Sequence, residues 1–316
     1  MLWTELINMK KESESKIKTV SDIFTLITNI IKFTVFAFFA LFILGIFGAA
    51  ISEGFEVGNV AVIPIEGMIT REDSFVKGAN SQDIVEFIEE ANEDSSIEAI
   101  LLDINSPGGT PVATDEIAQA VKAANKTVVA VISETGASGA FWIATAADRI
   151  FANPMSVTGS IGVQASRLEF GGLLADYNVT YRRLIAGKYK DTGSLWREMT
   201  PDEQQMYQQL LDKLHSRFIK TVAENRNLNE QKVRSLATGF VFLGSEAKEL
   251  GLIDELGGKK EALEYLEKKL NITAEPVEYE RPLTFFEELS GVTSQSFYNM
   301  GRGLGSLESE TKVTLT

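Results

Sequence analysis

The hydrophobic and polar positions of this 316-residue chain divide it into short apolar runs and amphipathic segments. Near-continuous apolar runs at 97–104 (IEAILLDI) and 127–133 (TVVAVIS) are typical of strands buried on both faces of a sheet. Between and around them, residues 82–92, 114–124 and 140–147 have helical character. The alternation of strands and helices predicts one α/β domain with a parallel sheet and crossover helices. Shorter apolar runs predict further strands at 60–65, 149–152 and 179–185.

The second half of the chain begins with a strong helix-start signal. Thr200-Pro201-Asp202-Glu203 supplies a cap, a proline at the first helical position and a capping-box acid. Apolar residues then recur every fourth position to about residue 225, which predicts an amphipathic helix. This stripe consists of Met206, Leu210, Leu214, Phe218 and Val222. A charged helix is expected at 259–270, after two glycines. Asn229 and Ser245 are the expected N-caps of two shorter helices, and Ser81 is the expected N-cap of the helix at 82–92.

Residues 33–51 (FTVFAFFALFILGIFGAAI) carry no charge. A helix of this length spans roughly 28 Å, close to the ~30 Å hydrocarbon core of a bilayer. Lysines precede the run and acidic residues follow it, so the positive-inside rule places residues 1–32 in the cytoplasm. A cleaved signal peptide is the alternative, because Gly48-Ala49-Ala50 is a small-residue run; a buried core helix is a weaker one. The long leader favours a retained, single-pass anchor in the cytoplasmic membrane.

The predicted organisation is therefore a cytoplasmic segment, one membrane span, an extracytoplasmic catalytic domain and a polar tail. The bounds are 1–32, 33–51, 55–272 and 273–316. Composition narrows the function of this domain. A formal net charge of −14 argues against nucleic-acid binding. The absence of cysteine excludes disulfides, thiolate–zinc sites and cysteine nucleophiles. No motif for a metal or cofactor is present, so none is expected.

Ser138 is the candidate nucleophile. It lies in Gly136-Ala137-Ser138-Gly139-Ala140, after a buried strand and at the start of a helix, where free N–H groups favour negative charge. The sequence nearly fits the G-x-S-x-G pattern, with Ala140 in place of the last glycine. The alternative is that Ser138 is an N-cap. The glycines of Asn105-Ser106-Pro107-Gly108-Gly109 follow the previous strand, and their amides could bind an oxyanion or form an ordinary turn.

A serine nucleophile needs a base, and lysine is the available side chain. The single histidine, His215, lies inside the amphipathic helix and is a poor candidate. Lys188 and Lys190 are equal candidates by composition. Lowering a lysine pKa from about 10.4 to about 7 takes roughly 4–5 kcal/mol, which burial without a counter-ion can supply, so Asp191 must point away. Ser160, in a glycine-flanked turn, could orient the amine or be a turn serine.

Several ordered motifs together resemble the signal peptide peptidase A family in its short, single-domain form. The resemblance covers roughly residues 58–270, and several motifs in matching order make it specific. It implies a fold related to Clp protease and crotonase, a Ser-Lys dyad, and assembly into a ring or dome. The motifs are NSPGG (105–109), ASG (137–139), ATAAD (144–148), TGSIGV (158–163), GKYKD (187–191), REMT (197–200) and GLIDELG (251–257).

The resemblance assigns roles to individual residues. It implies that Ser138 is the nucleophile, Lys190 the general base and Ser160 the residue that orients the lysine. The backbone N–H groups of Gly109 and Gly139 would form the oxyanion hole. The chain departs from the family at residues 192–196 and at Ala140, which affects the expected shape of the substrate groove.

The resemblance also implies the function, a serine endopeptidase that degrades remnant signal peptides left in the membrane. The span would hold the active site close to these peptides and to membrane lipid. In the family's short form, the serine and lysine of one site can come from neighbouring subunits of a homo-oligomer. Two alternatives stay open, an acyl-CoA enzyme of the crotonase type and a non-enzymatic membrane scaffold on the same fold.

Overall fold

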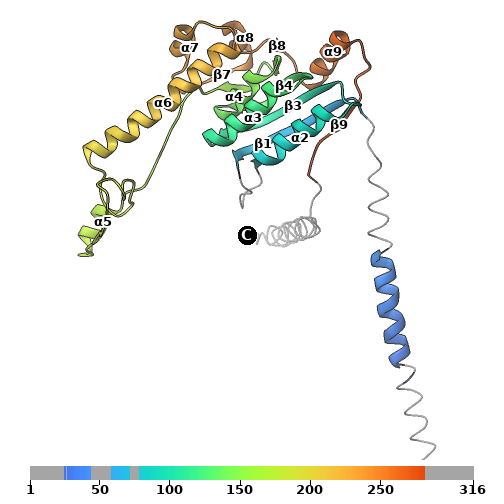
Figure 1. Ribbon diagram of the computed structural model, residues 1–316, viewed down its shortest axis with the longest axis horizontal. Helices are drawn as coiled ribbons and strands as arrows, with labels where there is room; N and C mark the ends of the chain where they lie inside the picture. Colours follow the sequence, from blue (N-terminus) through green and yellow to red (C-terminus); the bar gives the residue numbers. More distant parts are fainter. Residues whose placement is uncertain (1–24, 26, 44–57, 72–77, 282–316) are drawn as a thin grey trace, which may run out of the picture. The chain divides into compact units, whose positions relative to one another are not determined.

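A computed structural model describes residues 25, 27–43, 58–71 and 78–281 (Figure 1). The chain forms two compact units, residues 1–57 and 58–316. In the first unit, the described residues are helical. Residues 44–51 of the predicted span lie outside the described residues. Among the residues that are described, no helix has both the length and the apolarity needed to cross a membrane.

The second unit is built on a sheet of nine described strands, whose middle is formed by three long ones. These are β1 (Val60–Thr70), β3 (Ala99–Gly109) and β4 (Thr127–Ala137). The sheet order is β2-β1-β3-β4-β5-β8, and every pair along this path is parallel. The outer strands of this path are β2 (Ala79–Asn80), β5 (Arg149–Ala152) and β8 (Glu255–Leu256). The predicted parallel α/β class is confirmed.

Three short strands extend this sheet. β6 (Val157–Gly159) pairs with the C-terminal end of β4, beyond β5, and pairs in antiparallel fashion with β7 (Val241–Leu243). β9 (Pro276–Glu278) pairs with β1. The first residues of the predicted polar tail thus include a strand of the sheet, and residues 282–316 lie outside the described part. The pairing of β6 with β4 matters most, because both strands end at the same edge.

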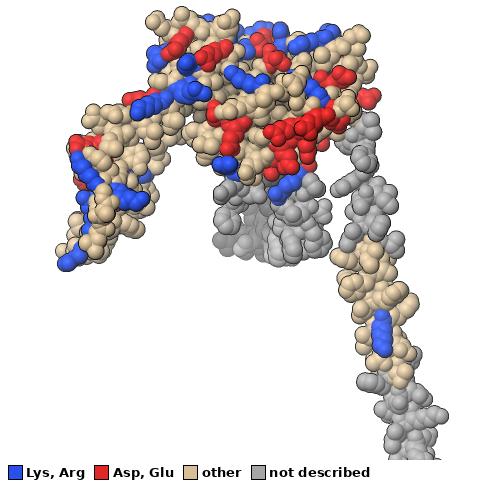
Figure 2. All heavy atoms as spheres, in the orientation of Figure 1, with Lys and Arg blue, Asp and Glu red and all other residues tan. Residues whose placement is uncertain are grey.

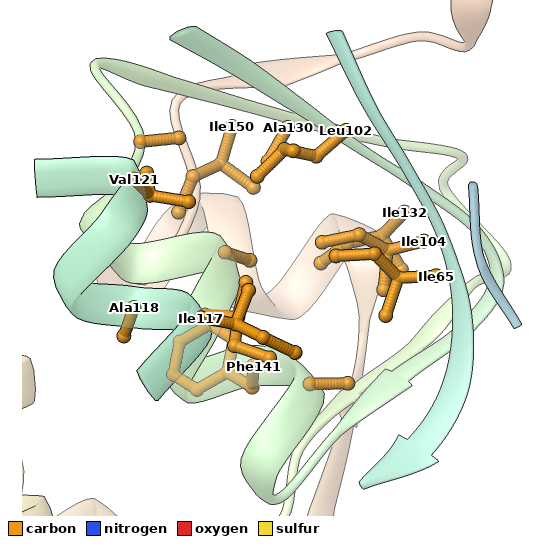
Figure 3. Close-up of a cluster of buried hydrophobic side chains, with 14 of the residues drawn as sticks. Ile65, Leu102, Ile104, Ile117, Ala118, Val121, Ala130, Ile132, Phe141 and Ile150 are labelled. Carbon is orange, nitrogen blue, oxygen red and sulfur yellow. The ribbon is translucent and has the colours of Figure 1, made fainter. Parts of the chain in front are cut away.

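The long strands are buried on both faces, as their apolar runs predict. On β3, Leu102 and Ile104 face one layer of helices, whereas Leu101 faces the other. The first layer contains α2 (Ser81–Glu93), α3 (Pro111–Ala123) and α4 (Gly139–Ala146), and the second contains α9 (Lys259–Leu270). Phe141 of α4 and Ile117 of α3 lie in the core between the first layer and the sheet (Figure 3). This packing fixes the strand ends that carry the candidate site.

Helix α6 (Pro201–Asn225) begins with the predicted capping box. Its C-terminal half packs on the core, where Phe218 stacks on Trp142 of α4 with ring centroids 4.9 Å apart. Its N-terminal half does not: Met206 and Leu210 are exposed. The helix predicted to about residue 225 is confirmed, but its apolar stripe is an incomplete guide to burial within one chain, because two of its five residues face solvent.

Residues 164–200, called the arm below, precede α6 and contain α5 (Gly171–Asp176). Figure 1 shows α5 beyond the end of α6 that is farther from α4. The strand predicted at 179–185 is wrong, because these residues have no strand conformation. Their side chains are exposed, so the apolar run has no sheet to join.

Several predicted helix ends shift by a few residues. Asn80, not Ser81, caps α2 through Gln82. Helix α3 begins at Pro111, three residues before the predicted start, because proline fits the first helical turn. Helix α8 (Gly244–Leu250) follows Leu243, so Ser245 is not its cap. Asn229 caps α7 (Glu230–Leu236) as predicted.

Candidate active site

The turn between β4 and α4 holds Ser138 in a backbone conformation that few residues other than glycine adopt. Its φ is 53° and its ψ is −121°, outside the regions open to most side chains. A serine in such a strained strand-to-helix turn exposes its hydroxyl, as the nucleophile elbow of a hydrolase does. Ser138 stands at the N-cap position, yet its side chain makes no capping hydrogen bond. The hydroxyl is therefore left available for chemistry.

Two backbone hydrogen bonds hold this conformation. The N–H of Ser138 donates to the carbonyl of Gly159 at 2.8 Å, and its carbonyl accepts from the N–H of Trp142 at 3.0 Å. Gly159 ends β6, and the register of β4 and β6 places it opposite Ala137. The sheet on one side and the first turn of α4 on the other thus set the position of the nucleophile before any substrate binds.

A second turn, at the end of β3, lies directly against Ser138. The buried hydroxyl of Ser106 organises it, donating to the carbonyl of Gly67 at 2.6 Å and accepting from the N–H of Gly108 at 3.1 Å. Gly108 has a φ of +107°, and a Cβ there would lie 2.9 Å from the Cβ of Ser138 and 2.8 Å from the nitrogen of Gly139. Only glycine allows the two turns to approach this closely.

The amides of Gly109 and Gly139 meet beside Ser138. A Cβ on Gly139 would lie 3.2 Å from the nitrogen of Gly109. The N–H of Thr110 donates to Ile69 of β1, and successive N–H groups of a strand point to opposite sides, so the Gly109 N–H points away from β1. Gly139 is the first residue of α4, where N–H groups have no intrahelical partner. Two donors thus converge where an oxyanion could sit.

Ser160 follows Gly159 and also has a positive φ, of 50°. Its N–H donates to the carbonyl of Phe240 at 3.0 Å and its hydroxyl to that of Gly239 at 3.2 Å. The next residue, Ile161, has its carbonyl 3.2 Å from Nε2 of His215. The turn that carries Ser160 is thus held in place beside the nucleophile. Among the described residues no lysine contacts Ser160, and its expected role is not fulfilled within one chain.

Lys190 is exposed on the arm, outside the sheet domain that holds the nucleophile. The arm is tied to α6 at Glu203, whereas α6 reaches the core at Phe218. Fifteen helical residues separate these two points, which is about 22 Å along the helix axis. The structure therefore brings together Ser138, Ser160 and the two glycine amides, and leaves Lys190 apart.

Asp191 points away from the lysines, as a neutral Lys190 requires. Its carboxylate accepts hydrogen bonds from Arg197 and Arg183, at 2.7–3.1 Å, and these two guanidinium groups lower the pKa of Asp191 to about 2. Arg197 also binds Glu203 at 2.6 Å, and it holds the pKa of that buried carboxyl well below its ordinary range. This network, which the sequence analysis missed, fixes the shape of the loop next to Lys190.

Lys188, the other candidate base, has a different environment. Its Nζ lies 4.7 Å from the ring centroid of Tyr189 and 3.4 Å from a carboxylate oxygen of Asp202. The Tyr189 hydroxyl and then the Asp202 carboxylate raise the pKa of Lys188 above its ordinary value. Its amine is thereby stabilised in the charged form, which is unsuitable for a general base.

Comparisons with known proteins identify the family of this chain. Residues 120–273 match the model of peptidase family S49. A protein of Methanocaldococcus jannaschii named as a candidate protease is 35% identical over 226 residues, which cover 71% of this chain and 72% of that protein. The chain belongs to peptidase family S49. It is therefore a protease, and its relatives include proteins of the signal peptide peptidase A kind.

One such S49 relative is a candidate signal peptide peptidase A of Enterococcus faecium, 33% identical over 211 residues, which cover 66% of this chain and 61% of that protein. Among solved structures, a ClpP1 mutant of Listeria monocytogenes is similar, with a TM-score of 0.45 and 18% identity. The similarity covers 63% of this chain and 92% of that one.

Proposed function

We propose that this S49 protease is a membrane-anchored serine endopeptidase that degrades remnant signal peptides, with Ser138 as nucleophile and Lys190 as general base. The observation that carries the proposal is the strained Ser138 turn beside the amides of Gly109 and Gly139. Such a turn suits attack on a carbonyl followed by stabilisation of the resulting oxyanion. Family membership favours peptide hydrolysis over the acyl-CoA enzyme and over the scaffold.

The proposed mechanism has two stages. Neutral Lys190 takes the proton of Ser138, whose oxygen bonds to the carbonyl carbon while the carbonyl electron pair moves onto its oxygen. The amides of Gly109 and Gly139 stabilise that oxyanion. Lys190 then protonates the leaving amine, and water hydrolyses the acyl-enzyme. Ser160, next to the Ser138 turn, orients the amine through its hydroxyl.

We infer that the lysine of one site comes from a neighbouring copy of the chain. Within one chain, the arm that carries Lys190 is tied to α6 at Glu203, about 22 Å along the helix from Phe218, where α6 packs on α4. The arm also contains exposed apolar side chains unusual for a free surface, among them Leu168, Leu173, Tyr177, Leu184 and Trp196. A second copy that covered them would also exclude water from the Lys190 amine, which favours its neutral form.

Charge and shape support the same occupant. The arm has six basic and four acidic residues, in a chain whose net charge is −14. Figure 2 shows Lys and Arg side chains along the arm and acidic side chains gathered on the sheet domain. A hollow of about 520 Å³ on the arm, lined by Tyr181, Arg183 and Trp196 among others, could receive a side chain of the neighbour. We therefore propose a ring of copies, with each arm on the core of the next copy.

The membrane anchor and the substrate are also part of the proposal. The charge-free run at 33–51 supports an anchor that leaves the peptidase domain outside the cytoplasm. Extraction with alkaline carbonate should leave the full chain in the membrane fraction, and its release would contradict the anchor. Protease added outside right-side-out vesicles should digest the peptidase domain, and protection of the domain would contradict its placement outside the cytoplasm.

The substrate class has its own test. Synthetic signal peptides should be cleaved at least tenfold faster than a folded protein, and equal rates would contradict the substrate class.

A serine-reactive fluorophosphonate probe tests the nucleophile. The wild-type protein should be labelled at Ser138, and Ser138→Ala should lose both labelling and peptidase activity. His215→Gln should keep both the labelling and the peptidase activity, because the ring of His215 contacts the Ile161 carbonyl rather than the nucleophile. Unchanged peptide hydrolysis in Ser138→Ala would overturn the proposal.

Mixing inactive subunits tests the shared site. Ser138→Ala and Lys190→Ala should each be inactive alone, because each lacks one half of the dyad. Dissociated, mixed and reassembled, they should regain activity well above that of either parent, since some interfaces then combine an intact serine with an intact lysine. Mixed oligomers that form without regaining activity would show that both residues must come from one chain.

A further inference from the structure

Thr114, in the second turn of α3, has a buried hydroxyl that the mechanism above does not use. The residue is 2% exposed, and its Oγ1 has no hydrogen-bond partner among the described residues. A helical threonine usually satisfies its hydroxyl with the carbonyl three or four residues earlier. Here the carbonyl of Thr110 accepts a hydrogen bond from the Thr114 N–H at 3.1 Å, but it accepts none from the Thr114 hydroxyl. A buried polar group without a partner calls for a physical explanation.

The hydroxyl is turned toward Gly139, one of the two residues whose amides form the candidate oxyanion hole. A Cβ on Gly139 would lie 2.4 Å from Oγ1 of Thr114 but 3.4 Å from its Cβ, so the oxygen is the part of the side chain turned toward Gly139. This Cβ position on Gly139 also lies 3.2 Å from the nitrogen of Gly109. This contact also explains the glycine after the nucleophile, because any side chain there would meet the Thr114 hydroxyl.

We propose that the Thr114 hydroxyl is a third donor of the oxyanion hole. When Ser138 attacks the peptide carbonyl, the electron pair on the carbonyl oxygen accepts hydrogen bonds from the Gly109 and Gly139 amides and from Thr114 O–H. The Thr114 proton stays on its oxygen, and no bond to Thr114 is made or broken. The inference rests on the proposed serine mechanism.

The resting state explains why such a donor helps catalysis. The unpaired hydroxyl is unfavourable in the free enzyme and gains its acceptor only as the oxyanion forms. An interaction that is stronger in the transition state than in the ground state raises kcat rather than substrate affinity. Thr114 is therefore a catalytic residue whose effect should be separable from binding and from stability.

Replacing Thr114 by the isosteric valine is the direct test. Thr114→Val should lower kcat for a fluorogenic peptide by about 100-fold, the usual effect of losing one oxyanion-hole donor, with KM changed less than threefold. Its melting temperature should be unchanged or higher, because an unpaired buried hydroxyl has been removed. A peptide aldehyde, which forms a tetrahedral adduct with the serine, should bind more weakly by a factor similar to the loss in kcat.

Thr145 provides a matched control in the next helix. It is equally buried, but its hydroxyl donates to the Trp142 carbonyl at 2.6 Å and accepts from Asn225 at 2.9 Å. Thr145→Val should therefore show the opposite pattern, a lower melting temperature with kcat within twofold. Thr114→Ser, which retains a hydroxyl, should recover at least tenfold of the activity that Thr114→Val loses.

Each remaining outcome decides against the proposal. A kcat for Thr114→Val within threefold of wild type would overturn it, as would a loss of kcat that tracks a lower melting temperature. If the valine variant does not fold, Thr114→Ala and Thr114→Ser replace it, and equal kcat for these two overturns the inference. Fluorophosphonate labelling of Ser138 in wild type separates this failure from that of the serine mechanism, which the absence of labelling would refute.

Discussion

The Ser138 turn and the arm show two ways of building half an active site. The turn is set by the sheet: the register of β4 with β6 and the close approach of β3 hold the nucleophile and the two amides in place. The arm has no sheet to join, and the network of Arg197, Asp191 and Glu203 ties its loop to α6. One half is complete within a single chain, whereas the other presents a lysine to solvent.

This difference teaches how a protease can be kept inactive until it assembles. A backbone oxyanion hole gains from rigidity, because its donors need no reorganisation at the moment of reaction. A lysine base has the opposite requirement, since it must lose its water to become neutral. Placing the amine on a separate arm would allow this desolvation to occur only when a second copy is present.

The largest expected effect lies on the rigid side of the comparison. A Cβ on Gly109 would lie 1.9 Å from the carbonyl oxygen of Ile69, so Gly109→Ala must push β3 away from β1. We expect a loss of about 3 kcal/mol or more in the free energy of unfolding and no measurable hydrolysis. Gly172→Ala, on the arm, has no neighbouring atom within 4 Å of the new Cβ and should change neither quantity. A stable Gly109→Ala protein in a urea titration would contradict this account of the turn.

Breaking the arm should affect activity more than global stability. Arg197→Met leaves the carboxylates of Asp191 and Glu203 together without their shared cation, which is strongly unfavourable locally. We expect faster hydrogen exchange in residues 183–203 and at least a tenfold loss of activity, with exchange in β3 and β4 unchanged. Arg234→Met removes an exposed i,i+4 pair with Glu230 and should cost at most about 0.5 kcal/mol. Equal exchange in Arg197→Met and wild type would show that the network does not hold the arm.

Acid should loosen the same network. The pKa of Asp191 is lowered to about 2 in the folded chain, by Arg197 and then Arg183, against about 3.9 for an unperturbed aspartate. A lowered carboxyl pKa stabilises the fold fully above the unfolded value, and this stabilisation is lost as the pH falls through the folded value. Arm exchange, corrected for the intrinsic rate, should therefore rise between about pH 4 and pH 2. Asp191→Asn should weaken this rise, and an identical profile would contradict the assignment.

The sequence predicted the Ser138 turn better than the arm, for a physical reason. The buried runs at 97–104 and 127–133 predict two parallel strands. Because the loops after such strands meet at one edge of the sheet, the sequence predicts that Ser138 lies close to Gly108 and Gly109. Thr114 was missed because a buried threonine in a helix has no distinctive pattern. Its role depends on which face of α3 meets Gly139, and periodicity alone does not give that contact.

The arm could not be predicted in the same way, because many of its apolar side chains are exposed within one chain. The run at 179–185 has the composition of a buried strand and is exposed, and Met206 and Leu210, which belong to the helical stripe, are also exposed. Periodicity identifies an apolar face without naming what covers it. Both errors fall on the surface that we assign to a second copy, so the failed predictions and the proposed interface have one cause.

The smallest expected effect separates the two lysines of the arm. Lys188 is 70% exposed, and its contact with Asp202 is long, at 3.4 Å, so Lys188→Met should leave the urea midpoint of unfolding unchanged within error. Because its raised pKa keeps the amine charged, its loss should leave turnover within twofold. Lys190→Met changes the same side chain two residues away and should abolish turnover in the assembled protein. If Lys188→Met were the inactive variant, Lys188 would be the general base, and assembly would have to break the contact between Lys188 and Asp202.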